Sequence, residues 1–157
     1  MLALIAIYPS VFASGQYPET VSQAVSYPAK TLIGTDGSAR FNVTIQVTYS
    51  GFKHGYDTLN IILAYDYLGS FADMPAGNAH SSPNQCNSTS SLGTTDCNIT
   101  PKNSSGIETV TFNVVIPSAK NQQYSFASWV IVQDSFYATQ GGIVAGGKSL
   151  FDVTVSN

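Results

Sequence analysis

The side chains able to do acid–base or metal chemistry are few in this chain and stand far apart. His54 and His80 are the two imidazoles, and neither has a histidine or glutamate at metal-ligand spacing. Glu19 and Glu108 are the two glutamates, and no carboxylates are spaced as a catalytic pair. The sequence has no nucleophile elbow, phosphate loop or dinucleotide-binding motif. We therefore expect a protein that is not an enzyme and that uses no metal or cofactor.

Two cysteines, Cys86 and Cys97, are the next reactive groups. A bridge between them would close a loop of about 12 residues and stabilise the fold by roughly 3 kcal/mol on the chain-entropy model. The alternative is two free thiols. Because the chain has no other cysteine and is rich in glycosylation sequons, we expect the disulfide and an oxidising, extracellular location.

Four Asn-x-Ser/Thr sequons could carry N-linked glycans, at Asn42, Asn87, Asn98 and Asn103. Three of them crowd into residues 87–103, inside a polar loop, which favours a glycosylated surface segment over chance occurrence. Pro101 follows the Asn98 sequon closely and makes that site the least secure. We expect the surest occupancy at Asn87 and Asn103.

The composition limits the partners that this surface can bind. Only 10% of the 157 residues are charged, and the net charge is −3 with five lysines and one arginine. Such a chain has no basic stripe for phosphate backbones and no cationic cluster for anionic lipids. Neither nucleic acid nor a membrane surface is therefore an expected partner. The length fits one domain with a core of its own.

The N-terminal tail is an unbroken apolar run that stops at Pro9, and its residues are Met1, Leu2, Ala3, Leu4, Ile5, Ala6, Ile7 and Tyr8. The run is too short for a membrane-spanning helix, and a complete secretion signal would begin with basic residues, which are missing before Lys30. Its length fits a β-strand of roughly 26 Å. Because it is apolar on both pleat faces, we expect a strand that completes a sheet and is buried on both sides.

The rest of the chain predicts a linker over residues 9–20 and one β domain over residues 21–157. Segment 21–33 predicts an edge strand with a bulge or a change of sheet at Pro28. Segment 40–49 alternates strictly, and segment 58–68 is apolar at nearly every position, as in a central strand. Further strands are predicted at 107–116, 123–133 and 150–155.

Segment 76–106 predicts a long polar loop, and the pairs Gly141-Gly142 and Gly146-Gly147 predict turns or bulges. No segment has a convincing helical period. We therefore expect an all-β fold, an immunoglobulin-like antiparallel β-sandwich of six or seven strands. The predicted core comprises Phe41, Val43, Ile45, Val47, Leu59, Ile61, Leu63, Val110, Phe112, Val114, Phe126, Val130, Val132, Phe151, Val153 and Val155.

An apolar tail, a Pro/Gly linker, one sandwich and clustered sequons together resemble pilins joined by donor-strand complementation, above all the N-glycosylated subunit of the archaeal thread filament. The resemblance spans the whole chain and depends on arrangement and composition. It implies that residues 1–8 are the donor strand, that residues 9–20 link subunits, and that the four sequons carry glycans. The protein would then be a head-to-tail extracellular cell-surface filament, meeting a membrane only at its base and serving adhesion or biofilm formation.

Two other interpretations stay open. One is a monomeric secreted carbohydrate-binding or adhesin module whose tail folds back on its own sheet. The other is a secreted hydrolase with an unrecognised site.

Overall fold

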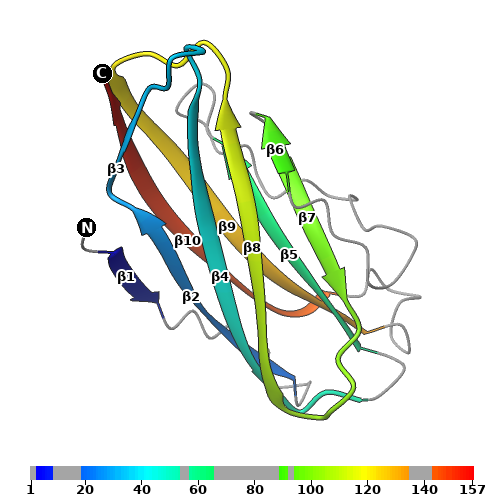
Figure 1. Cartoon of the computed structure of the whole chain (residues 1–157). Coiled ribbons are helices and arrows are strands. Elements are labelled where there is room, and N and C mark those ends of the chain that lie inside the picture. Colours follow the sequence, from blue (N-terminus) through cyan, green and yellow to red (C-terminus); the bar gives the residue numbers. More distant parts are fainter. Residues whose placement is uncertain (1–2, 9–18, 54–56, 66–88, 92–93, 135–142) are drawn as a thin grey trace.

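The computed structural model describes residues 3–8, 19–53, 57–65, 89–91, 94–134 and 143–157. This part of the chain contains strands and no helix (Figure 1). The strands are β1 (Ala3–Tyr8), β2 (Thr20–Pro28), β3 (Lys30–Leu32), β4 (Ala39–Ser50), β5 (Asp57–Tyr65), β6 (Thr89–Ser91), β7 (Thr94–Ile99), β8 (Gly106–Ile116), β9 (Gln122–Asp134) and β10 (Ile143–Ser156).

The described strands form two sheets, one behind the other in Figure 1. Sheet A has the order β1-β2-β4-β8-β6, and sheet B has the order β3-β10-β9-β5-β7. Each sheet turns one face toward the other, and the main hydrophobic core fills the space between them. The predicted all-β sandwich is therefore confirmed.

The core follows the alternation of the strands. In β4 the residues from Phe41 to Tyr49 alternate between buried apolar and more exposed polar side chains, so the predicted register is correct. Every residue of the predicted core is buried. Rings join the two sheets, with Phe41 and Phe126 packed edge to face at 5.6 Å and Tyr27 stacked on Phe151 at 4.4 Å between centroids.

Strands β5 and β9 are buried on both faces. Their second apolar cluster lies on the side of sheet B that faces away from the main core, and it consists of Ile62, Ala64, Ala127, Trp129 and Ile131. This explains why segment 58–68 is apolar at nearly every position. Trp129 and Ile131 therefore face the opposite side from Val130 and Val132.

The chain changes sheets at Pro28, as one of the two predictions for that residue had it. Strand β2 pairs with β4 in sheet A, whereas β3 pairs in parallel with β10 in sheet B. Between them, Ala29 accepts a hydrogen bond from the Thr154 amide at 3.0 Å. The prediction that this segment is an edge strand was wrong for β2, because β1 pairs along its other side.

Parts of two segments predicted as a loop and as turns or bulges are strands, contrary to expectation. The polar loop predicted at 76–106 contains β6 and β7, and β7 pairs with β5 from Ala64↔Thr94 to Leu59↔Ile99. Gly146 and Gly147 lie inside β10, opposite Ile131 and Val130, and the irregularity falls between Ile143 and Ala145 instead. In both places backbone pairing with an apolar neighbour outweighs weak local strand propensity.

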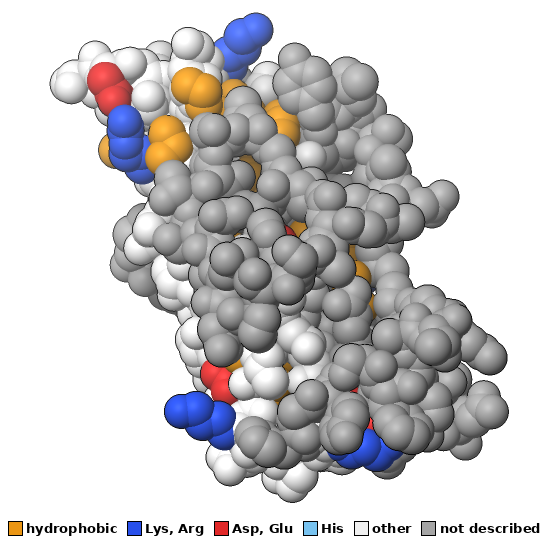
Figure 2. Space-filling view, turned by 90° about the vertical axis from the view of Figure 1, so that its right-hand side faces the viewer, with side chains coloured by type: hydrophobic (Ala, Val, Ile, Leu, Met, Phe, Trp, Pro, Cys, Tyr) orange, Lys and Arg blue, Asp and Glu red, His pale blue; other side chains and the backbone are white. Residues whose placement is uncertain are grey.

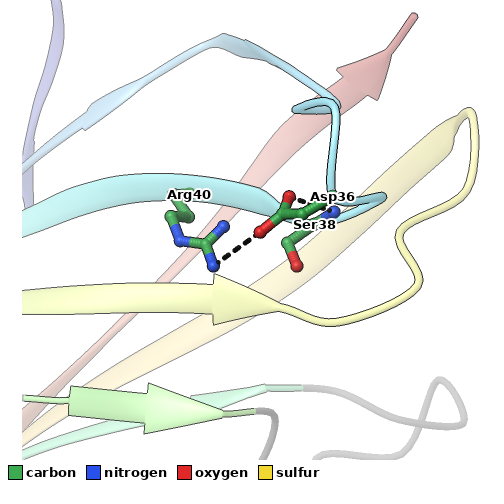
Figure 3. A network of polar contacts seen from close by, with 3 residues as sticks. All are labelled: Asp36, Ser38 and Arg40. Carbon is green, nitrogen blue, oxygen red and sulfur yellow. Dashed lines mark hydrogen bonds and ion pairs between the residues drawn. The ribbon is translucent and has the colours of Figure 1, made fainter.

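The connection from β3 to β4 is a tight turn held by one aspartate (Figure 3). Asp36 accepts a hydrogen bond from the Ser38 amide at 3.0 Å and pairs with Arg40 at 2.8 Å. The Ser38 amide, and then the Arg40 guanidinium, lower the pKa of Asp36 below its ordinary value of 3.8. Gly37 adopts φ 75°, which suits glycine. The Asp36 contacts and the positive φ of Gly37 together account for the turn.

Candidate assembly edges

The predicted donor segment is an edge strand of sheet A. Residues Ala3 to Tyr8 pair antiparallel with β2, from Ala3↔Pro28 to Tyr8↔Gln23. In Figure 1 the dark-blue β1 lies beside β2 at the margin of the sheet. Met1 and Leu2 lie outside the described residues. The tail therefore completes a sheet, and the sheet belongs to its own chain.

Strand β2 offers β1 two different faces. Val21, Gln23, Val25 and Tyr27 are buried toward the core, while Ser22, Ala24 and Ser26 are more exposed on the other side. The pairing aligns Ile5 with Ser26 and Ile7 with Ala24, which belong to the exposed set. The neighbour of β1 is thus apolar on its core side and more polar on its other side.

The residue that directly precedes β2, Glu19, is held in place at one end of the sandwich. Glu19 is 1% exposed, and its carboxylate lies 3.9 Å from the Lys53 ammonium. The Lys53 amide donates a hydrogen bond to the Asp57 carboxylate at 2.5 Å. These contacts tie the start of β2 to the connection between β4 and β5. Thr20, assigned to the linker from the sequence, already belongs to β2, and residues 9–18 lie outside the described residues.

At one edge of sheet B, β10 is the last long strand, and the short strand β3 pairs with its C-terminal end. Strand β10 pairs with β9 from Ile143 to Val155, but its other side pairs with β3 only at Thr154, Val155 and Ser156. None of the described strands pairs with that other side of β10 between Ile143 and Val153. An unpaired strand edge is where another chain can add a strand.

The four sequons differ in exposure. Asn42 is exposed on the outer face of β4, and Asn103 is exposed between β7 and β8. Asn98 is 4% exposed, within β7 and opposite Asn60. Asn87 lies outside the described residues. A glycan needs an accessible amide nitrogen, so burial at Asn98 opposes modification there in the folded chain.

Of the cysteine, histidine, lysine and arginine side chains in the sequence, the structure describes Cys97 together with the lysines and the arginine. Cys97 is buried in the main core and is disulfide-bonded, whereas Cys86, like His54 and His80, lies outside the described residues. On the side of the molecule in Figure 2, the Lys and Arg side chains stand near the two ends and form no stripe. Among the described residues, no three His, Cys, Asp or Glu side chains form a group that could hold a metal.

Comparisons with known proteins identify no family for this chain. No protein-family model matches the chain, and no curated protein is similar to it.

Proposed function

We propose that the protein is the structural subunit of an extracellular filament in which the N-terminal strand of one subunit completes a sheet of the next. The observation that carries the proposal is β1 itself. It is an apolar strand at the edge of sheet A that, among the described strands, pairs with β2 alone, and in the sequence residues 9–18 lie between it and the rest of the domain. A strand held in this way can exchange between identical chains at low cost.

The arrangement of the body supports the same proposal. Strands β2-β4-β8-β6 face β10-β9-β5-β7, and the chain passes from the first sheet to the second between β2 and β3. Immunoglobulin-type sandwiches divide their strands in a similar way. Such domains commonly act as modules of cell-surface chains, and the exposed sequons Asn42 and Asn103 suit a glycosylated exterior. The filament would serve adhesion or biofilm formation, with identical subunits as its partners.

Electron microscopy of the purified full-length chain tests the proposal, in parallel with a chain that lacks residues 1–8. We expect filaments from the full chain and none from the deleted chain. A control in which residues 1–8 are replaced by an equally long Gly/Ser segment separates the need for an apolar strand from the need for chain length. Filaments formed by the deleted chain would contradict the proposal.

A second candidate function has one observation in its favour. Because β1 pairs with β2 of the same chain, a monomeric secreted carbohydrate-binding or adhesin module with a folded-back tail also fits. A full-length chain that stays monomeric at high concentration, with β1 protected from hydrogen exchange, would favour this module over the filament.

A further inference from the structure

The tail is apolar at every position from Met1 to Tyr8, but the edge it occupies in its own chain is apolar on one side only. On the outer face of sheet A, away from the core, β2 carries Ser22, Ala24 and Ser26, and β4 carries Thr44. Thr44 makes a hydroxyl hydrogen bond of 2.9 Å with Thr111 of β8, so this polar face continues across three strands. Ile5 and Ile7 are aligned with Ser26 and Ala24 of this face. The edge along β2 therefore has an apolar surface on the core side only.

Near its free edge, sheet B carries apolar side chains on both faces, and on the outer face of β10 the exposed Lys148 and Asp152 flank Leu150. Toward the core, β10 presents the buried Phe151. On the opposite side, the row Ala64, Ala127, Leu150 crosses β5, β9 and β10. Ala64 and Ala127 are buried, whereas Leu150, at the edge, is 50% exposed. Leu150 thus continues this apolar row to the edge of β10 and is exposed there.

The length of this edge fits the tail. The side of β10 that faces away from β9 has no described strand partner over Ile143–Val153, which is eleven residues against the eight of Met1–Tyr8. Beyond it, β3 already pairs with β10 in parallel over Thr154–Ser156. A tail strand paired with Ile143–Val153 would lie end to end with β3 along the same edge of β10.

Strand direction is compatible with the same edge. Strands β2, β3 and β10 all run away from the end of the sandwich where Glu19 anchors the tail. In a head-to-tail row, all subunits have the same orientation. A tail that leaves one subunit at this end and enters the next has Tyr8 nearer to its own subunit and Met1 farther from it. From Met1 to Tyr8, such a tail runs in the same direction as β10. It can therefore pair with β10 in parallel without turning back. The antiparallel pairing seen with β2 would require residues 9–18 to reverse direction inside the neighbour.

We propose that the acceptor for the tail between subunits is the free edge of β10, where residues Met1–Tyr8 of a second copy pair in parallel with Ile143–Val153 and cover Leu150. The pairing with β2 is then the resting position of the tail within one chain. This inference rests on the proposed filament function and identifies the edge that the filament uses.

Cysteine cross-linking in mixtures of full-length chains tests the acceptor edge. One partner carries Leu4→Cys or Ile5→Cys. Because neighbouring residues of a strand point to opposite faces of the sheet, one of these two positions would lie on the same face as Leu150 in either orientation of the tail. The other partner carries Leu150→Cys or Ser26→Cys. A disulfide between these single variants joins two different chains, and mass spectrometry of the linked peptides identifies the residues.

We expect polymers in which a tail cysteine links to Leu150→Cys of another chain. Polymers linked only to Ser26→Cys, or polymers without either link, would overturn the β10 acceptor and leave the filament function standing. The double variant Ile5→Cys/Ser26→Cys tests pairing within one chain. If it forms only the internal disulfide and the protein stays monomeric, both proposals are overturned, because the tail then pairs only with its own chain.

A charge on the edge gives a second, independent measurement. Leu150→Lys places an ammonium where the tail would cover the leucine, and we expect at least a tenfold lower polymer fraction from a fold that is otherwise retained, since this side chain is half exposed. Ile107→Lys is the matched control, because Ile107 is 59% exposed on sheet A, which lacks β10. Equal polymer fractions for the two variants would overturn the inference.

Discussion

Gln23 of β2 and Ser128 of β9 bond to each other across the core, between the two sheets. The Ser128 hydroxyl donates to the Gln23 side-chain oxygen at 2.7 Å, and the Gln23 amide nitrogen donates to the Ser128 carbonyl at 3.5 Å. Both residues are buried. Since a buried amide must keep its partners, the pair favours one alignment of β2 over sheet B.

Replacing one member of this pair should destabilise the fold more than an equivalent change at the surface. Ser128→Ala leaves the Gln23 oxygen buried without its hydroxyl donor, and we expect a loss of about 1–3 kcal/mol in the free energy of unfolding, measured by urea denaturation. Ser125→Ala, on the same strand, removes only an exposed bond to Asp152 and should cost less than about 0.5 kcal/mol. Equal costs for the two variants would contradict this account.

A methyl group at Gly106 should clash with the Tyr49 ring. The two residues are opposite each other in β8 and β4, and a Cβ at Gly106 would lie 2.8 Å from the Tyr49 hydroxyl oxygen and 3.1 Å from Cζ. We expect Gly106→Ala to cost about 1–3 kcal/mol. In a Tyr49→Phe background the cost should be smaller, because the closest atom is removed. A double-mutant cycle with zero coupling would show that the contact is not responsible.

Alkaline pH should destabilise the fold through Tyr49. Burial, and then the Glu108 carboxylate, raise the pKa of Tyr49 above its ordinary value of 10.0. The unfolded chain therefore releases this proton first. The resulting stability is fully present below pH 10.0 and is lost as the pH rises through the folded-state pKa. Unfolding free energies measured from about pH 8 to pH 11 should fall less steeply for Tyr49→Phe than for the parent chain, since the other tyrosines titrate in both. Identical slopes would contradict the assignment.

Glycan occupancy should follow exposure. Native protein should have an intact mass well above 16.6 kDa, with sugar at the exposed Asn42 and Asn103 and none at the buried Asn98. Site-resolved mass spectrometry of glycopeptides measures this directly. With so few charges, hydration of the surface depends on uncharged groups, and glycans at these sites would contribute to it. A native mass equal to that of the bare chain would remove the main support for a glycosylated exterior.

The alternation of side chains was enough to predict the core. Period-two patterns such as Phe41 to Tyr49 identify both the strand and its buried face, because neighbouring residues of a strand point to opposite sides of the sheet. The same alternation gives β9 two apolar faces, with Val130 on one and Trp129 on the other. Of the two alternatives predicted at Pro28, a bulge or a change of sheet, the change of sheet is the one that occurs, and Pro28 cannot donate a hydrogen bond to a ladder.

Pairing partners, in contrast, were decided by the tertiary structure. Strand β7 has the polar sequence Thr-Thr-Asp-Cys-Asn-Ile and is a strand because β5 presents an open edge beside it. The burial of Asn98 follows from that pairing and not from its own sequon. An apolar tail likewise predicts that some sheet edge will be completed, but its sequence is equally compatible with β2 and with β10. The backbone groups of an edge are alike on every strand, so the choice depends on which faces the assembled sheets leave apolar and in which direction their strands run.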